Sequence, residues 1–182
     1  MIAFENVCKR FGEHTVLENF SFSLGAGEQL CLVGPSGRGK STVLNLAAGL
    51  MEPDAGRILC QADRICYLFQ EDRLLPWLSA LQNVALVCPE QQAQDWLDRL
   101  GLGDFLDAKP AQLSGGMARR VAIARALAFP AELYLFDEPF RGLDEQTLAQ
   151  TLEVIREALA GKAALFVSHR PQELGIPTLR LA

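Results

Sequence analysis

Hydrophobic residues in this chain follow two spacings that alternate along its length. In residues 20–24, phenylalanine and leucine alternate with serine, the period-two pattern of a half-buried strand. Largely apolar segments at 29–33, 133–136 and 163–167 are typical of strands buried on both faces. Because segments with helical spacing separate these runs, the pattern predicts an α/β fold with a mainly parallel sheet covered by helices.

Helical spacing is clearest in four segments: 43–50, 89–101, 114–127 and 144–161. A proline in its first turn and a glycine at its end bound the second segment. In the third segment, Ser114 can cap the helix that begins at a pair of glycines. Charged residues on such a helix usually face water, so its three arginines are interpreted as solvated: Arg119, Arg120 and Arg125.

The residues after the 29–33 strand have the form G-x-x-x-x-G-K-[ST]. Glycines let such a loop curve around a polyphosphate, and the following helix adds the positive end of its dipole. Lys40 can reach the β- and γ-phosphates, and Ser41 can offer its hydroxyl to Mg²⁺. The alternative is a turn that binds nothing, but the flanking strand and helix favour nucleotide binding. The predicted binding residues are Gly34, Pro35, Ser36, Gly37, Arg38, Gly39, Lys40, Ser41 and Thr42.

Three further features each have a functional and a structural interpretation. Asp137 and Glu138 follow a buried strand and could serve the phosphates, or they could form a turn with a helix cap. Phe11, between two apparent strands, either closes the core or stacks on a base. The apolar segment Leu74–Trp77 is either covered by neighbouring helices or forms a docking face for a partner.

Composition limits the possible functions. The chain has 182 residues and a formal net charge of −5, so we expect no nucleic-acid partner. Apolar residues make up 49%, which is ordinary for a globular protein, and no apolar run is long enough to cross a bilayer. The five cysteines are odd in number and lack metal-ligand spacing, which favours a reducing compartment.

Six motifs in order resemble those of the ATP-binding subunit of an ABC transporter, and the resemblance covers nearly the whole chain. They are the phosphate loop, Gln70 as the glutamine loop, LSGGM at 113–117 as the signature motif, LYLFDEP at 133–139, GLD at 142–144, and His169 as the switch histidine. Two motifs depart from the family pattern. Met117 replaces the usual Gln, and Arg170 and Pro171 replace the acidic residue that commonly follows His169.

The resemblance implies a P-loop NTPase fold with a small antiparallel β lobe and an inserted helical lobe. The chain would be one ABC-type domain, 1–182, with a core lobe at 1–70 and 131–182 and a helical lobe at 71–130.

The resemblance also implies ATP and Mg²⁺ as cofactors and a role for each motif. The implied catalytic residues are Lys40, Gln70, Glu138 and His169. The implied Mg²⁺ ligands are Ser41, Gln70 and Asp137, and Phe11 would stack on adenine. A second anion-binding helix start would close over ATP held by the Lys40 of another subunit, through Ser114, Gly115 and Gly116.

The implied partners follow from the same resemblance. The segments after Gln70 and around the signature motif are similar to those of bacterial importer subunits of the nitrate, sulfonate and taurine type. The chain would form a head-to-tail dimer, with itself or with a paralogous ATP-binding subunit. It would lie peripherally on the cytoplasmic face of the inner (cell) membrane. There it would contact integral membrane permease subunits through Leu74–Trp77 and power import of a small solute.

Two other classes share these nucleotide motifs. A chromosome or DNA-repair ATPase usually carries a long coiled coil, and this chain has no sustained heptad repeat. A non-hydrolysing regulator would be expected to lack Glu138 or His169, and both are present. We therefore predict a transport-coupled ATPase that converts ATP and water to ADP and phosphate, with an ABC-type ATPase not coupled to transport as the alternative.

Overall fold

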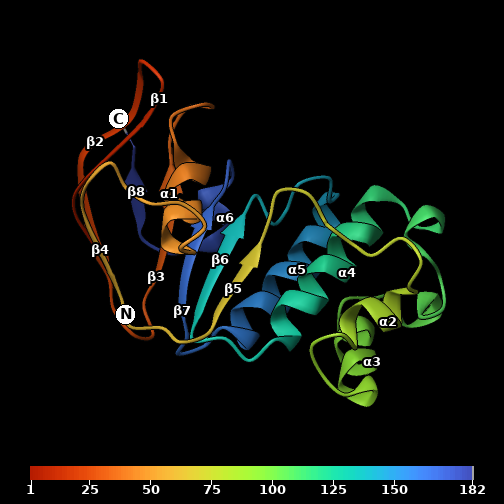
Figure 1. Cartoon of the computed structure of the whole chain (residues 1–182). Coiled ribbons are helices and arrows are strands. Elements are labelled where there is room, and N and C mark those ends of the chain that lie inside the picture. The colour runs from red at the N-terminus through yellow and green to blue at the C-terminus, as the bar shows by residue number, and fades with distance from the viewer. Residues whose placement is uncertain (182) are drawn as a thin grey trace. The chain divides into compact units, whose positions relative to one another are not determined.

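The computed structural model describes residues 1–181, which form two compact units (Figure 1). The sheet unit comprises Met1–Tyr67, Ala131–Asp137 and a last stretch that begins at Gly161. The helical unit comprises Leu68–Pro130 and Glu138–Ala160. The division between the units passes between Asp137 and Glu138.

The sheet unit contains most of the strands. Its elements are β1 (Ile2–Phe11), β2 (His14–Leu24), β3 (Gln29–Val33), α1 (Lys40–Ala47), β4 (Ala55–Cys60), β5 (Ile65–Leu68), β6 (Leu133–Asp137), β7 (Ala163–Val167), α6 (Pro171–Leu174) and β8 (Thr178–Arg180). The helical unit contains α2 (Ala80–Val84), α3 (Glu90–Arg99), the 3₁₀ turns η1 (Gly103–Phe105) and η2 (Pro110–Gln112), α4 (Gly115–Ala128) and α5 (Glu145–Ala158).

The strands form one mainly parallel sheet, as the hydrophobic pattern predicts, and one antiparallel sheet, as the family resemblance implies. Strands β2, β1 and β4 pair antiparallel in that order. The second sheet has the order β5-β6-β7-β3-β8, in which β3 pairs in parallel with β7 and β8, and β6 with β7. The predicted α/β fold class, with a small antiparallel β portion, is confirmed.

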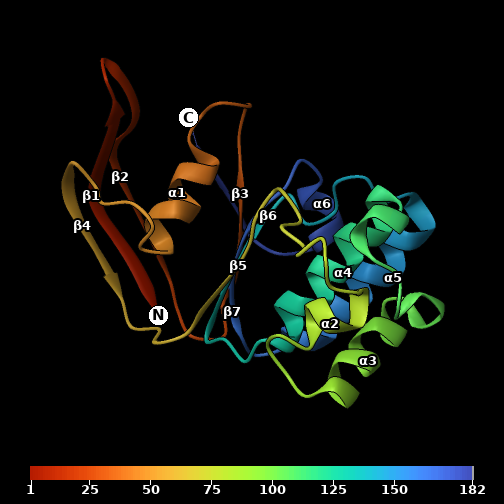
Figure 2. The ribbon, with the colours of Figure 1, turned by 45° about the vertical axis from the view of Figure 1, so that its right-hand side comes forward.

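The first helix, α1, lies between the two sheets (Figure 2). One apolar core connects all three, with Phe4 from β1, Leu44 from α1 and Leu135 from β6 fully buried within it. Each such side chain contributes roughly 1.5–3 kcal/mol when it is removed from water. This core holds the start of α1, and therefore the loop before it, against the parallel sheet.

Strand register fixes which residues share the carboxyl edge of the parallel sheet. Val167 of β7 pairs with Leu32 of β3 on one side and with Asp137 of β6 on the other. Asp137 is therefore level with the end of β3, from which the glycine-rich loop begins. Ligands of open α/β sheets bind outside this edge.

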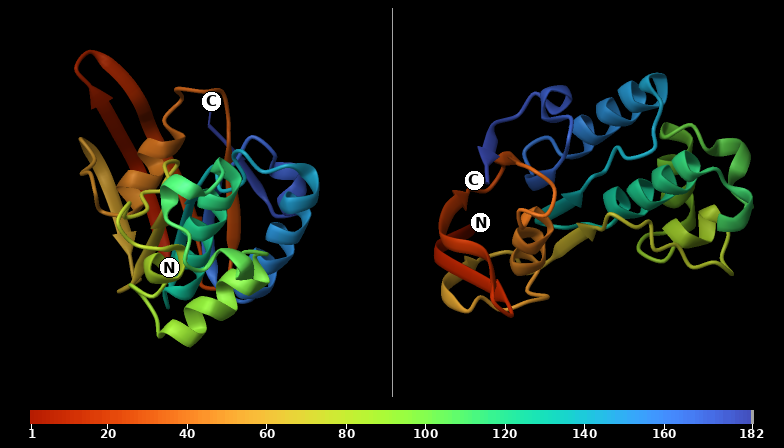
Figure 3. Two further views of the ribbon diagram at one scale, coloured as in Figure 1. Left: turned by 90° about the vertical axis from the view of Figure 1, so that its right-hand side faces the viewer. Right: turned by 90° about the horizontal axis from the view of Figure 1, so that it is seen from above.

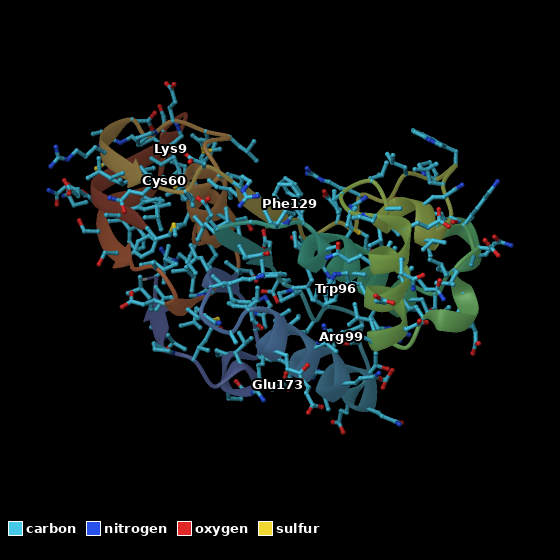
Figure 4. All side chains as sticks on the ribbon, turned by 90° about the horizontal axis from the view of Figure 1, so that it is seen from below. Lys9, Cys60, Trp96, Arg99, Phe129 and Glu173 are labelled. Atoms are coloured by element: carbon cyan, nitrogen blue, oxygen red, sulfur yellow. The ribbon has the colours of Figure 1, made fainter. Side chains whose placement is uncertain are left out.

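In the helical unit, α4 packs against α2, α3 and α5 (Figure 3). Arg99 of α3 forms an ion pair of 2.9 Å with Glu157 of α5. Its guanidinium also lies 4.6 Å from the ring centroid of Trp96, beside which it is seen in Figure 4. Within residues 1–181, none of the helices has the length and apolar character needed to cross a membrane.

Candidate functional site

The predicted phosphate loop curls over the start of α1. Gly37 and Gly39 have φ of 79° and 85°, which L-residues rarely adopt, and a Cβ on Gly39 would lie 2.5 Å from Val16 Cγ1. Lys40 is only 7% exposed, and its Nζ donates to the carbonyl oxygens of Gly34 and Pro35 at 2.9 Å each. The lysine is therefore held inside the curve of its own loop, where an anion bound by the loop would meet its charge.

The first turn of α1 has polar groups that suit an anion. Ser41 and the loop residues Pro35, Ser36 and Arg38 are exposed, and Thr42 is half-buried. No side chain caps this helix at Gly39. The first N–H groups of a helix have no partner inside the helix, so they can bind an anion at this end.

Asp137 and His169 lie at the same sheet edge as this loop. Asp137 ends β6 and is 4% exposed, and exposed His169 lies two residues beyond the end of β7. The Asp137 carboxylate and the Ser41 hydroxyl are oxygen donors of the kind that Mg²⁺ prefers. Residues 1–181 contain no group of three His, Cys, Asp or Glu side chains that could hold a metal alone. Protein sites usually hold Mg²⁺ through one or two carboxylates, with phosphates and water completing its coordination, and Asp137 offers one such carboxylate.

Phe11 does not close the core. It ends β1 and is 49% exposed, and Lys9 Nζ lies 5.9 Å from its ring centroid. The core-packing alternative is therefore wrong for this residue. Its exposed ring can stack on a planar ligand.

In the helical unit, the predicted signature motif forms the start of α4. The Ser114 hydroxyl accepts a hydrogen bond of 3.2 Å from the Met117 N–H, which confirms the predicted cap. Ser114 and Gly115 are exposed, whereas a Cβ on Gly116 would lie 3.2 Å from the Gly142 carbonyl oxygen. Glycine at 116 thus permits close approach of the 142–144 loop, and Gly115 leaves the helix start open.

A cavity of about 270 Å³ lies beside this helix start, within the helical unit. Its lining comes from three chain segments: Gln70, Glu71, Asp72, Gly115, Arg119, Arg141 and Gly142. The fold therefore gathers the glutamine loop, the start of α4 and the loop after Glu138. Sequence order alone could not show this juxtaposition.

Glu138 has an unusual backbone. Its φ of 48° is in the left-handed region, which is uncommon for residues other than glycine. Such conformations cost roughly 1–3 kcal/mol and cluster at functional sites. Nothing in the sequence around Glu138 indicates this conformation.

Arg119 is not solvated, and the interpretation made from the sequence is wrong for this residue. It is 2% exposed, and its guanidinium donates to the carbonyl oxygens of Phe69 at 2.7 Å and Glu138 at 2.8 Å. Buried charge is stable when its donors are satisfied, as they are here by carbonyls of two loops. Helical spacing could have predicted this burial, because Arg119 lies three and four residues before Ala122 and Ile123, which are buried on the same face of α4.

The segment Leu74–Trp77 is only partly covered. Trp77 is 66% exposed, while Leu74 and Leu75 are half-buried. Buried Asn83 fixes the segment, because its Oδ1 accepts from the Leu75 N–H at 2.8 Å and its Nδ2 donates to the Leu75 carbonyl at 3.2 Å. The alternative in which neighbouring helices cover this segment does not hold for Trp77.

Comparisons with known proteins agree with this geometry. A family model described as "ABC transporter" matches residues 17–141. The aliphatic sulfonates import ATP-binding protein SsuB 1 of Pseudomonas syringae pv. syringae is 39% identical over 171 residues, 91% of this chain and 72% of that protein. The bicarbonate transport ATP-binding protein CmpD of Synechocystis is 40% identical over 181 residues, 87% of this chain and 62% of that protein.

Solved structures give the same result. A dimeric structure of the ATP-binding cassette MJ0796 in a post-hydrolysis state with ADP and Pi has a TM-score of 0.89 and 30% identity. The match covers 100% of this chain and 94% of the MJ0796 chain. The resemblance drawn from the six motifs is confirmed. The chain belongs to the ABC transporter family, as one of its ATP-binding ATPase subunits.

Proposed function

We propose that this subunit powers import of a small solute through integral membrane permease subunits. The observation that carries the proposal is the shared sheet edge, where the register of β3, β7 and β6 brings the phosphate loop level with Asp137. Relatives named for import of sulfonates and transport of bicarbonate and nitrate support the direction and the class of cargo.

ATP binding is assigned to the sheet unit. The loop from Gly34 to Thr42 would surround the phosphates, with Lys40 as the main cation. Phe11 would stack on the adenine. Ser41 and Asp137 would hold Mg²⁺, with Gln70 as a further ligand, and the bound ion would neutralise charge on the β- and γ-phosphates.

Hydrolysis is assigned to the residues that follow the strands. Glu138 would orient and polarise the water that attacks the γ-phosphorus, and Gln70 would help to position that water. His169 would hydrogen-bond the γ-phosphate and so detect its presence. Lys40 would stabilise the charge that develops as the phosphoryl group transfers.

A second copy of the chain, or a paralogous subunit, would complete the site. Ser114, Gly115 and Gly116 of one subunit would close over ATP held by the other, since this helix start has no phosphate loop of its own nearby in sequence. Dimeric structures of MJ0796, matched with TM-scores of 0.89 and 0.90, support the pairing of two cassettes.

The membrane contact is assigned to the segment Leu74–Trp77, supported by the 66% exposure of Trp77. This would place the subunit on the cytoplasmic face of the cell membrane. We propose that residues 1–182 form a single cassette. Its core lobe would comprise 1–70 and 131–182, and its helical lobe 71–130.

The proposed chemistry is tested by ATP turnover of Glu138→Gln beside Glu153→Gln. Both variants remove one carboxylate, but Glu153 lies on the exposed face of α5. We expect Glu138→Gln to bind ATP and lose about 100-fold or more in kcat, while Glu153→Gln keeps its turnover. Full turnover by Glu138→Gln would contradict the assigned role.

A further inference from the structure

One arginine of α4 connects the two proposed catalytic segments of the helical unit. Arg119 Nη1 donates to the Phe69 carbonyl at 2.7 Å, to the Gln70 carbonyl at 3.4 Å, and to Asp72 Oδ1 at 3.2 Å. On its other side, Nη2 donates to the Glu138 carbonyl at 2.8 Å, and Nε donates to the Pro139 carbonyl at 3.0 Å. The same side chain therefore holds the segments on either side of the cavity.

We propose that Arg119 is a positioning residue that fixes the backbones of Gln70 and Glu138 relative to each other. It would act through these residues and would not touch ATP, and the inference rests on the roles proposed for them above. The residue stands on the helix that Ser114 caps, so one rigid element would align the signature motif, the glutamine loop and the proposed catalytic glutamate.

The chemistry of guanidinium suits this task better than that of any other side chain. Arginine offers five N–H donors in a fixed planar fork, whereas lysine offers one point charge. Arg119 bonds acceptors on two segments at once, and at 2% exposure these bonds are shielded from water. A lysine at this position would keep the charge but could not satisfy all of these acceptors in one geometry.

The left-handed backbone at Glu138 explains why such an anchor is needed. A residue with φ of 48° would relax to a commoner conformation unless its surroundings held it. The Glu138 carbonyl accepts from Arg119 and also from the Arg141 N–H at 3.2 Å, which closes a turn. Arg119 thus stabilises the peptide whose conformation aims the glutamate.

Two other arginines of the same helix separate this role from general packing. Arg125 Nη2 donates to the carbonyls of Asp72 and Arg73 at 2.9 and 3.0 Å, on the glutamine-loop side, and its Nη1 donates to Asn83 Oδ1 of α2 at 3.4 Å. Arg120 Nη1 donates to the Leu100 carbonyl at 2.7 Å, at the end of α3. This bond involves neither the glutamine loop nor the segment that follows β6. The chain therefore offers a graded set of variants.

Amide hydrogen exchange of the 182-residue chain tests the proposal without requiring turnover. In Arg119→Lys we expect faster exchange, by about tenfold, in peptides covering 69–73 and 138–143. Arg125→Gln should speed exchange in 69–73 but not in 138–143, and Arg120→Gln in neither of these two peptides. Unchanged exchange in 138–143 for Arg119→Lys would overturn the proposal.

Turnover provides the second readout. Arg119→Lys and Arg119→Gln should lose about 10- to 100-fold in kcat while the affinity for a fluorescent ATP analogue stays within about threefold, because displaced catalytic groups affect chemistry more than binding. Arg120→Gln should keep kcat within about threefold. Equal losses in kcat and affinity, or two Arg119 variants that are unfolded at the assay temperature, would reject positioning in favour of a folding role.

The same assay includes Glu138→Gln, so that two failures can be distinguished. If Glu138→Gln is inactive while folded Arg119 variants turn over normally, only the positioning role is wrong. If Glu138→Gln turns over at the wild-type rate, the role proposed for the glutamate is wrong.

Discussion

The starts of helices α1 and α4 differ in structure, although we propose that both contact ATP. Helix α1 begins at Gly39 in a left-handed conformation, without a side-chain cap and with Lys40 held within the loop. Helix α4 begins at Ser114, whose hydroxyl already accepts from the Met117 N–H. The first start leaves backbone donors for an anion and adds a cation, whereas the second is stabilised by its own side chain.

The difference indicates a division of labour. A start with open N–H groups and a lysine can bind ATP by itself. A capped start, whose buried Arg119 is engaged with carbonyls, has fewer means of holding a phosphate alone. We therefore expect α1 to determine ATP affinity in one chain, and α4 to determine whether two chains close over that ATP.

The largest effect is expected from a substitution at the start of α1. Lys40→Ala should weaken ATP binding by about 100-fold or more and abolish turnover, because it removes the cation inside the loop. Titration with a fluorescent ATP analogue and a phosphate-release assay measure both effects. Lys109→Ala, at an exposed position of the helical unit, is the control. ATP affinity in Lys40→Ala equal to that of the control would reject the phosphate-loop assignment.

The next effect depends on loop geometry. Gly39→Ala combines strain at φ of 85° with a Cβ 2.5 Å from Val16 Cγ1, whereas Gly37→Ala has strain at φ of 79° and no neighbour within 4 Å. We expect Gly39→Ala to destabilise the chain by about 1–3 kcal/mol and to weaken ATP binding. Gly37→Ala should have the smaller effect on stability. Urea unfolding measures the difference, and equal midpoints for the two variants would contradict the crowding at Gly39.

A smaller effect is expected at the second start. Ser114→Ala should cost about 1 kcal/mol through loss of the cap, leave ATP affinity of the single chain unchanged, and weaken ATP-dependent dimer formation. Ser114→Thr, which keeps a capping hydroxyl, is the matched control for stability. If Ser114→Ala lowered the ATP affinity of the monomer as strongly as Lys40→Ala, the proposed division of labour would be wrong.

The smallest effect concerns a third helix start, at Asp144 before α5. Hydrogen bonds from the Thr147 N–H and then from its hydroxyl lower the pKa of this carboxyl below its ordinary 3.8. A lowered pKa in the folded chain means that this stabilisation is complete above the ordinary value and is lost as pH falls through the folded-state pKa. Asp144→Asn should therefore flatten the acid limb of stability below about pH 4. The change is measured by thermal unfolding of the wild type and Asp144→Asn between about pH 2 and 6. Parallel curves of stability against pH for the two proteins would exclude this carboxylate as a contributor.

Local features of this fold could be predicted from the sequence. The apolar run before Gly34 gave β3, and Ser114 before paired glycines gave the start of α4, because strands and caps depend on neighbouring residues. The burial of Arg119 depends on two loops that are distant in sequence, although its helical face carried a signal. The left-handed Glu138 could not be predicted, because tertiary contacts hold a conformation that its residue type disfavours.

The central claim is that ATP held at the start of α1 in one chain is closed over by the start of α4 in another. We would measure the solution mass of Glu138→Gln by light scattering after size exclusion, with and without Mg·ATP, and repeat it with Ser114→Ala in the same chain. A shift from monomer to dimer on adding ATP, lost or weakened by Ser114→Ala, is the predicted result. A persistent monomer with ATP demonstrably bound would contradict the claim.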